Sequence, residues 1–320
     1  MPFDHYVPAT YLARFSVDST EPRRKRRVWA IDKSDGRVFR SPVENICGQN
    51  NLYSVDRSNP RIIDEMWGYE GQLNDALDEL VAGTISARMW LGVLVNFVAA
   101  LLARGKEFHD RFQRRFVHGF GPGILPLLGP DNTNFARLME IQRLRASVLG
   151  AYWTVLLVPD VRIITNDLTF NAHEHSPSGK LGIAIPIDGS HVITLIPTTE
   201  KHVVAVSKDG AWWPQISRGT LSKSFASNFN AVMAASAQRF VIGETEIQMR
   251  SLLPLKNDAP PVPEPGSLGF MTGKMARQFE YTFFHTLAEL SKPAPEDGSY
   301  IFVNYRGNAR RRQRGSGSNY

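Results

Sequence analysis

The chain has 320 residues, 42% of them hydrophobic, and carries a formal net charge of +6 at pH 7. That length and composition allow a substantial core in one large or two moderate domains, and the single cysteine, Cys47, excludes an intramolecular disulfide and a cysteine-rich zinc site within one chain. The longest nearly apolar run, 90–103, is shorter than the about 20 residues of a membrane span, and the first residues lack the apolar stretch of a signal peptide, so we expect a cytoplasmic protein without a membrane segment.

The opening segment is predicted to be extended up to Pro8 and helical after it. A residue before proline is biased toward extended geometry, and Val7 holds that place. From Thr10, which we predict as the N-cap, apolar side chains recur at helical spacing and would face the core. They are Tyr11, Leu12 and Phe15. This junction would bring His5 and Arg14 into one neighbourhood; the alternative is a hydrogen-bonded structural histidine and a buried ion-pair arginine.

A run of five cations leads into a predicted β-hairpin. The run comprises Arg23, Arg24, Lys25, Arg26 and Arg27. Strands over 28–31 and 37–40 flank Asp35-Gly36, a dipeptide typical of tight hairpin turns. A further short strand is predicted over 52–55.

Helices are predicted to dominate the middle of the chain. Apolar residues recur at helical spacing over 62–81, 85–104, 107–117 and 134–157. Glu70, in the first of these helices, is either a functional acid or an ordinary surface charge. The last helix carries arginines that we expect to form surface pairs with Glu140 and its neighbours, with nucleic-acid contact as the alternative. They are Arg137, Arg143 and Arg145.

Beyond Pro159 the sequence changes to runs rich in β-branched residues, which indicate strands. The strands span 161–165, 181–187, 191–196 and 202–207, and a helix over 225–237 and a strand over 238–242 follow them. Asp188-Gly189 and Asp209-Gly210 mark tight turns, which favour antiparallel pairing. The sequence therefore predicts an α+β fold with a helical middle region and a largely antiparallel sheet.

Composition divides the chain into four parts. Residues 1–250 form the α+β core, 251–266 a Pro-rich linker or arm, 267–305 a C-terminal helix and strand that pack on the core, and 306–320 a disordered basic tail. The C-terminal helix is expected over 270–290.

The positive charge is concentrated in two short segments. The tail contributes five positive charges and the run 23–27 contributes five more. Subtracting these ten from the net charge of +6 leaves −4 for the remainder. Such runs bind phosphate through counterion release, or else are solvated edges and tails. The candidate nucleic-acid contacts are Arg23, Arg24, Lys25, Arg26, Arg27, Arg310, Arg311 and Arg312.

The N-terminal motif resembles a known family. His5-Tyr6-Val7-Pro8, followed by Tyr11-Leu12-x-Arg14-Phe15, is similar to the opening signature of the bacterial domain of unknown function 4238 family. Similar segments follow in order at Asn50 to Tyr53, Glu70, Leu101 to Arg104, Ile163 to Asp167, and around Asn228, Asn230, Ala237 and Arg239, so the similarity covers residues 3–245. Asn166 stands where serine is usual, and Leu168-Thr169 replaces Asn-Pro. The family has no established activity, so the resemblance implies no function.

The family-like polar positions define a hypothetical catalytic set. It consists of His5, Arg14, Glu70, Arg104 and Asp167. Arginine would neutralise a phosphate-bearing substrate while histidine or a carboxylate moves the proton. Asp167 ends a predicted buried strand, where a loop can close over a ligand. Its alternative role is to accept hydrogen bonds from backbone amides in a turn.

A metal site is a second, weaker hypothesis. His173 and His175 alternate along the chain, so in an extended segment both imidazoles would converge, with Asp167 as an oxygen ligand. The Ser, Pro and Gly residues of 172–180 indicate instead an exposed loop without a site. Cys47 is a possible nucleophile or, more simply, a small buried apolar residue. The sequence contains no nucleotide-binding loop or hydrolase motif that identifies a cofactor.

We therefore carry two functional hypotheses. The first is a phosphodiesterase-like or nuclease-like hydrolase, which requires His5 and Asp167 to share a cleft open to solvent. The second is a non-catalytic module that binds nucleic acid or protein through the two basic segments. A role as an interaction partner within a multi-protein operon is a third possibility.

Overall fold

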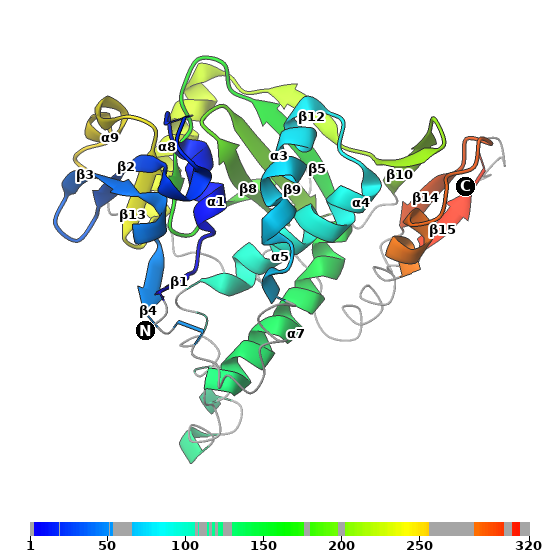
Figure 1. Ribbon diagram of the computed structural model, residues 1–320, viewed down its shortest axis with the longest axis horizontal. Coiled ribbons are helices and arrows are strands. Elements are labelled where there is room, and N and C mark those ends of the chain that lie inside the picture. Colours follow the sequence, from blue (N-terminus) through cyan, green and yellow to red (C-terminus); the bar gives the residue numbers. More distant parts are fainter. Residues whose placement is uncertain are drawn as a thin grey trace.

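The computed structural model describes residues 3–18, 20–50, 52–53, 66–105, 108, 114, 117–118, 121–123, 130–175, 180–197, 202–255, 285–303 and 309–313. Helices α3, α5 and α7 form the centre, a five-stranded sheet covers them, and two four-stranded sheets lie at opposite ends of the molecule (Figure 1). The mixture of helices with mostly antiparallel sheets confirms the predicted α+β class.

The N-terminal segment changes from strand to helix at Pro8. Strand β1 (Phe3–His5) pairs antiparallel with β4 (Gly48–Asn50), and helix α1 (Ala9–Leu12) continues into the 3-10 turn η1 (Ala13–Phe15). The predicted N-cap is wrong, because Pro8 occupies that position and Thr10 lies inside the helix. Proline is tolerated at this position because the first N–H groups of a helix have no acceptor within the helix, so the N–H that proline lacks is not required. The predicted inward face is confirmed, since Tyr11, Leu12 and Phe15 are fully buried.

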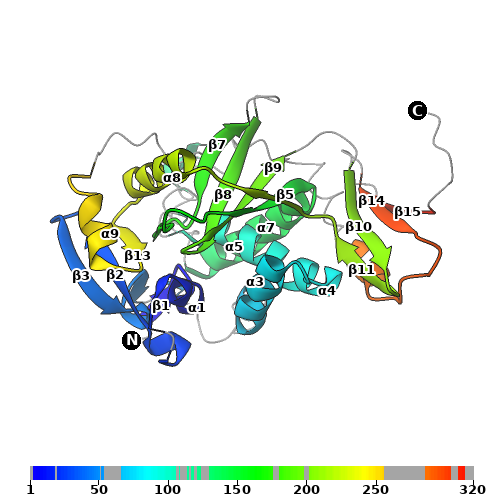
Figure 2. The same cartoon turned by 90° about the horizontal axis from the view of Figure 1, so that it is seen from above.

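One four-stranded sheet contains the predicted hairpin. Its order is β3-β2-β13-β6, with β2 (Arg27–Asp32), β3 (Arg37–Pro42), β13 (Phe240–Gly243) and β6 (Thr165–Asn166), and all its pairings are antiparallel. Helices α8 (Lys223–Ser236) and α9 (Glu246–Ser251) lie beside it (Figure 2). The turns η2 (Arg23–Lys25) and η3 (Val43–Asn45) flank the hairpin. Of the strand predicted over 161–165, only Thr165 is in a strand.

The central helices follow the predicted apolar periodicity. The turn η4 (Glu70–Gln72) leads into α3 (Leu73–Ala82), which ends at Gly83 with a left-handed φ of 80° that glycine adopts readily. Three segments then form the long helix expected over 85–104: α4 (Ala87–Met89), the π-helical η5 (Trp90–Leu94) and α5 (Val95–Arg104). By length and composition 87–104 could cross a membrane, but 78% of this window is buried inside the protein, as in a core helix.

Helix α7 (Pro130–Leu149) is shorter than predicted, because β5 (Ala151–Leu157) replaces its expected end. Gly150 separates the two elements, and the alternating burial along β5 matches the two-residue period of a strand. The remaining strands of this sheet are β7 (Asn171–His175), β8 (Lys180–Asp188), β9 (His191–Pro197) and β12 (Ser217–Thr220), in the order β12-β5-β9-β8-β7. Only β12 and β5 pair parallel. The loop predicted over 172–180 is therefore a strand as far as His175.

The second four-stranded sheet, which we call the C-terminal sheet, has the order β11-β10-β14-β15. Its strands are β10 (His202–Lys208), β11 (Ala211–Pro214), β14 (Tyr300–Val303) and β15 (Ala309–Arg312), and a helix over 285–290 precedes it. The prediction that the tail over 306–320 is disordered is wrong for 309–312, because these residues pair with β14 as a strand. The predicted linker from 256 onward, most of the helix over 270–290 and the segment 107–117 lie outside the described residues, apart from a few positions.

Two apolar clusters hold these parts together. The larger one joins α1, the central helices and the inner face of the five-stranded sheet, where Trp90 and Trp153 meet with ring centroids 5.9 Å apart. The smaller one packs α8 against β13, β8 and the chain before β6. The N-terminal segment is thus wedged between the central helices and the β2–β3 hairpin, which brings β1 close to the end of α5.

Candidate functional site

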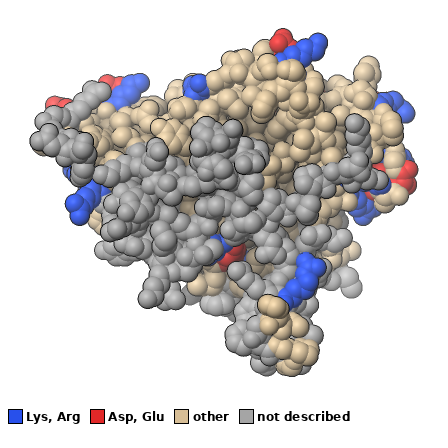
Figure 3. All heavy atoms as spheres, turned by 180° about the vertical axis from the view of Figure 1, so that it is seen from behind, with Lys and Arg blue, Asp and Glu red and all other residues tan. Residues whose placement is uncertain are grey.

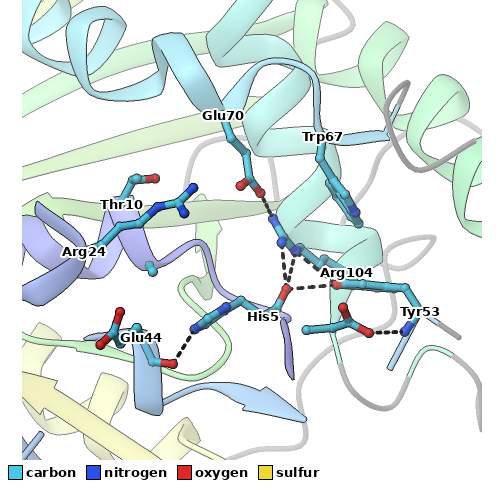
Figure 4. Close-up of a pocket in the computed structure, with 10 residues that line it drawn as sticks. His5, Thr10, Arg24, Glu44, Tyr53, Trp67, Glu70 and Arg104 are labelled. Atoms are coloured by element: carbon cyan, nitrogen blue, oxygen red, sulfur yellow. Dashed lines mark hydrogen bonds and ion pairs between the residues drawn. The ribbon is translucent and has the colours of Figure 1, made fainter. Parts of the chain in front are cut away.

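A polar pocket lies where β1, α1, the η2 turn and the end of α5 meet (Figure 4). Its volume is about 410 Å³, within the range of small-molecule sites. The lining residues are Asp4, His5, Ala9, Thr10, Arg24, Glu44, Tyr53, Trp67, Glu70 and Arg104. Three members of the hypothetical catalytic set, His5, Glu70 and Arg104, therefore converge here from positions spread over a hundred residues of chain.

The guanidinium of Arg104 is the most firmly held group of the pocket. It is 4% exposed, ends α5, and donates to the His5 carbonyl from Nε at 3.0 Å and from Nη2 at 2.6 Å, and to the Tyr53 hydroxyl at 3.0 Å. It also forms an ion pair with Glu70 and stacks 4.0 Å from the centroid of the Trp67 ring. Burial opposes the charge, but the surrounding Tyr53 and Glu70 outweigh it and raise the pKa of Arg104. The side chain is a fixed, permanently charged fork.

His5 contributes both its backbone and its ring. The carbonyl accepts the bonds from Arg104, and ring Nε2 lies 3.1 Å from the Glu44 carbonyl oxygen. A carbonyl can only accept, so this contact assigns a ring proton to Nε2. Burial lowers the pKa of His5 below its ordinary value, although the Glu44 carbonyl opposes that effect. The imidazole is therefore neutral at pH 7.

Arg24 is the exposed cation of the pocket. It projects from η2 toward the space between Thr10 and Glu70 (Figure 4) and forms no ion pair with any residue in the described ranges. Two polar atoms of residues that line the pocket, Thr10 Oγ1 and Trp67 Nε1, are fully buried and have no hydrogen-bond partner among the described residues. Buried donors and acceptors in this state are uncommon in folded proteins.

Arg14 does not line the pocket. Its side chain, 11% exposed, donates to the Ile187 carbonyl at 3.0 Å and pairs with Asp78 at 2.6 Å and with Asp188 at 3.4 Å. These contacts join η1 to α3 and to the β8–β9 turn. The buried ion-pair role that was the alternative for Arg14 is thus the one observed.

Asp167 is also outside the pocket and is satisfied locally. It is 5% exposed and accepts backbone hydrogen bonds from Gln238 at 2.9 Å, Arg239 at 2.7 Å and Phe240 at 3.2 Å. Burial raises the pKa of Asp167 while the three amides oppose that shift. The carboxylate joins β6 to β13, which is the structural alternative, so the cleft shared by His5 and Asp167 that the hydrolase hypothesis required is not formed.

The two basic segments have different environments. Arg23 lies 3.6 Å from Asp78, Arg26 donates to the Glu21 carbonyl at 3.1 Å, and Arg24 alone of the run lines the pocket. Arg310, Arg311 and Arg312 belong to β15. On the face shown in Figure 3, described Lys and Arg side chains lie around the rim, several beside Asp or Glu.

The arginines of α7 correct a further expectation. Arg143 pairs with Glu140 as predicted. Arg137 is instead 1% exposed, donates to Asn134 at 2.9 Å and stacks on the Tyr53 ring, and Arg145 is buried as well. Apolar periodicity did not reveal this because the stems of long cationic side chains can be buried.

The metal hypothesis gains no support. His173 and His175 pair with Gly182 and Lys180 across β7 and β8, and their side chains lie outside the described part. Among the described residues no group of three or more His, Cys, Asp or Glu side chains could hold a metal ion. Cys47 is buried, and burial raises the pKa of its thiol, which fits the apolar role.

Several pocket residues escaped the sequence analysis. Thr10, Trp67 and the carbonyl of Glu44 are brought to the pocket only by chain folding, and nothing in their local pattern marks them. An Asp188–His191 pair, with the ring Nδ1 3.0 Å from the carboxylate, was also missed. The turn Asp188-Gly189-Ser190-His191 was a signal for it, because a two-residue hairpin places its flanking residues opposite each other.

The pocket lies in a region that matches a family model. Residues 4–121 match the family model described as Protein of unknown function (DUF4238). This part of the chain is therefore similar to the DUF4238 family. The match confirms the resemblance seen in the N-terminal motif, and it includes His5, Arg14, Glu70 and Arg104, whereas Asp167 lies beyond the matched residues. No curated protein and no solved structure matches the chain. The DUF4238 region thus supplies all ten residues that line the pocket.

Proposed function

We propose that the pocket of the DUF4238 region binds a small molecule that bears a phosphate group. The observation that carries the proposal is the pairing of two guanidinium groups across one half-open pocket, the fixed Arg104 and the exposed Arg24. Guanidinium forks recognise phosphate oxygens through paired, charge-assisted hydrogen bonds.

The other polar groups of the pocket favour a particular kind of ligand. Glu70, with its side chain 32% exposed, already balances part of the Arg104 charge, and Asp4 accepts a bond from the Tyr53 amide at 3.1 Å. A ligand of several phosphates would meet these carboxylates, whereas a single phosphate on a polar organic group could meet the exposed Arg24 alone. We therefore favour a phosphomonoester or phosphodiester of small size.

Binding can be tested with inorganic phosphate and the nucleoside 5′-monophosphates as probes in isothermal titration calorimetry. Arg24→Ala should weaken binding by about tenfold, the effect of losing about 1.4 kcal/mol, without changing thermal stability. Arg88→Ala is the matched control, since Arg88 is an exposed arginine of α4 outside the pocket. The proposal fails if the wild type binds none of these probes or if Arg24→Ala binds them equally well.

A second candidate function is hydrolysis of that phosphoester. The neutral imidazole of His5 and the carboxylate of Glu70 line the same pocket, so either could take a proton from water as the water oxygen attacks phosphorus. The bond from phosphorus to the ester oxygen would break, and the departing oxygen would receive a proton. The exclusion of Asp167 from the pocket favours binding over hydrolysis, because it removes the carboxylate on which the catalytic hypothesis depended.

Release of p-nitrophenol from p-nitrophenyl phosphate and from bis(p-nitrophenyl) phosphate separates the two functions. A hydrolase should release product, and Glu70→Gln or His5→Gln should abolish the release while probe binding persists. Binding without product release would leave the phosphate-binding function and reject the hydrolase.

A further inference from the structure

The C-terminal sheet has one face on the protein core and one face away from it. Paired residues of neighbouring strands lie on the same face, and faces alternate along each strand. Ala205, Ile301 and Trp212 define the inner face, with exposed fractions of 0%, 3% and 5%. Arg311 belongs to this face and stacks on Trp212 with its Cζ 5.9 Å from the ring centroid. The outer face therefore carries the alternate residues.

Aromatic and cationic side chains gather on the outer face. Val206 pairs with Trp213 on one side and Tyr300 on the other, Tyr300 pairs with Arg312, and Phe302 pairs with Arg310. Lys208 and Arg310 are exposed, and the aromatic residues and Arg312 are half-buried. The outer face thus combines Trp213, Tyr300 and Phe302 with Lys208, Arg310 and Arg312.

Two cations of the outer face contact its aromatic rings. Lys208 Nζ is 5.3 Å from the centroid of Trp213, and Arg312 Cζ is 5.5 Å from that of Phe302. These distances are those of cation–π contacts, which hold positive charge above an aromatic surface. Nucleobases stack on aromatic rings and on guanidinium planes alike. The outer face accordingly combines aromatic rings with cations that contact two of them, Lys208 at Trp213 and Arg312 at Phe302.

The charge of this sheet differs from that of the rest of the chain. The four strands contain Lys208, Arg310, Arg311 and Arg312 and no Asp or Glu. Acids close to this sheet are Asp209 in the β10–β11 turn, Asp297, which accepts bonds from Ser299 and Gln313, and Glu289, which interacts with Arg311. Positive charge here is local, because the chain outside its two basic segments is acidic.

We propose that the outer face of the C-terminal sheet binds single-stranded nucleic acid. Trp213, Tyr300 and Phe302 would stack with bases, and Lys208, Arg310 and Arg312 would contact phosphates. Single strands fit better than a duplex, because only unpaired bases can stack on flat aromatic side chains. The proposal is independent of the pocket, which lies at the other end of the molecule (Figures 1 and 2).

The test is fluorescence anisotropy with labelled oligo(dT) and oligo(U) of about 20 nucleotides, long enough to span a sheet of this size. The wild type should bind both, and Arg310→Ala/Arg312→Ala should bind at least tenfold more weakly. The slope of log affinity against log salt should fall in magnitude by about 1.4, because each lost phosphate contact on a single strand removes about 0.7. Arg37→Ala, an exposed arginine of β3, should change neither value.

The aromatic contribution needs its own variants. Trp213→Ala should weaken oligo(dT) binding roughly 5-fold to 100-fold, the range for one stacked base, and Trp213→Phe should retain most of it. The conservative variant keeps the test valid if the alanine variant fails to fold. Arg24→Ala should leave oligonucleotide binding intact, which distinguishes this surface from the pocket.

Four results would overturn the proposal. The first three concern the wild type and Arg310→Ala/Arg312→Ala. They are no binding of either oligonucleotide by the wild type, equal binding by Arg310→Ala/Arg312→Ala, and binding of a duplex of the same length as tightly as oligo(dT). The last result would mean general attraction to polyanions. Equal binding by a folded Trp213→Ala would exclude stacking in the same way.

Discussion

The pocket and the Asp167 turn are two polar regions that differ in how their buried charged groups are hydrogen-bonded. In the pocket, Arg104 is buried, whereas Arg24 and Glu70 line the cavity and keep part of their surface exposed. At the turn, each carboxylate oxygen of Asp167 accepts backbone bonds, and no cavity adjoins it among the described pockets. A polar residue that stands out in a sequence can thus serve either binding or folding. What distinguishes the two is whether its partners leave hydrogen-bonding capacity toward solvent.

The largest effect on stability should come from the Asp167 turn. Asp167→Ala removes the acceptor of three backbone amides, and burying amides without partners costs about 1–3 kcal/mol each, partly relieved by water. We expect the free energy of unfolding to fall by about 3 kcal/mol with the affinity of the folded protein for phosphate unchanged. Urea denaturation measures the first quantity and calorimetry the second. A stable variant that has lost phosphate binding would reverse the assignment of the two regions.

Arg104→Lys should affect both stability and binding. Lysine keeps the charge but cannot reach His5, Tyr53 and Glu70 at once, because it lacks the planar fork. We expect a loss of about 2 kcal/mol in unfolding free energy and about tenfold in phosphate affinity. If the same measurements show wild-type values for both, Arg104 is not the group that organises the pocket.

The pH dependence of anion binding should separate binding from catalysis. Burial lowers the pKa of His5 from its ordinary value, so its ring gains a proton only at a pH lower than an exposed histidine requires. Sulfate, which keeps its charge over this range, should bind more tightly at pH 5 than at pH 7, and His5→Gln should remove the difference. Hydrolysis that uses the neutral ring as a base would instead decrease as the pH falls. Sulfate affinity independent of pH in the wild type would place His5 outside the binding site.

The smallest effect on stability concerns Lys33, which lies beside the Asp167 turn and donates its backbone N–H to the Arg239 carbonyl. Its Nζ donates to the carbonyls of Ala235 and Ala237 at 2.8 Å, at the C-terminus of α8 where a cation is favourable. Lys33→Met should lower the unfolding free energy by about 1 kcal/mol, whereas Arg24→Ala in the pocket should change it by less than about 0.5 kcal/mol. Thermal denaturation of the two variants side by side tests this contrast. A larger loss for Arg24→Ala would mean that Arg24 is structural.

Local patterns predicted those elements whose stability is local. The Asp35-Gly36 hairpin, the inward face of α1 and the apolar helix ending at Arg104 were all predicted from spacing and turn residues. The end of α7 was wrong, because Ala151 to Leu157 fits both periods and pairing with β9 decided for a strand. The order of 309–312 was missed for a related reason, since a run of arginines is stable in a strand only when a neighbour such as β14 pairs with it.

For the candidate site, the sequence is sufficient to select His5, Glu70 and Arg104 as residues of the pocket. Chain folding excludes Arg14 and Asp167 from the pocket and brings Arg24 and Thr10 into it, and no local pattern predicts either outcome. The physical reason is that hydrogen-bond partners of a buried polar group come from residues far away in the chain, such as Arg239 for Asp167 and Asp188 for Arg14. Spacing along the sequence carries no information about such partners, because they meet only when the core closes.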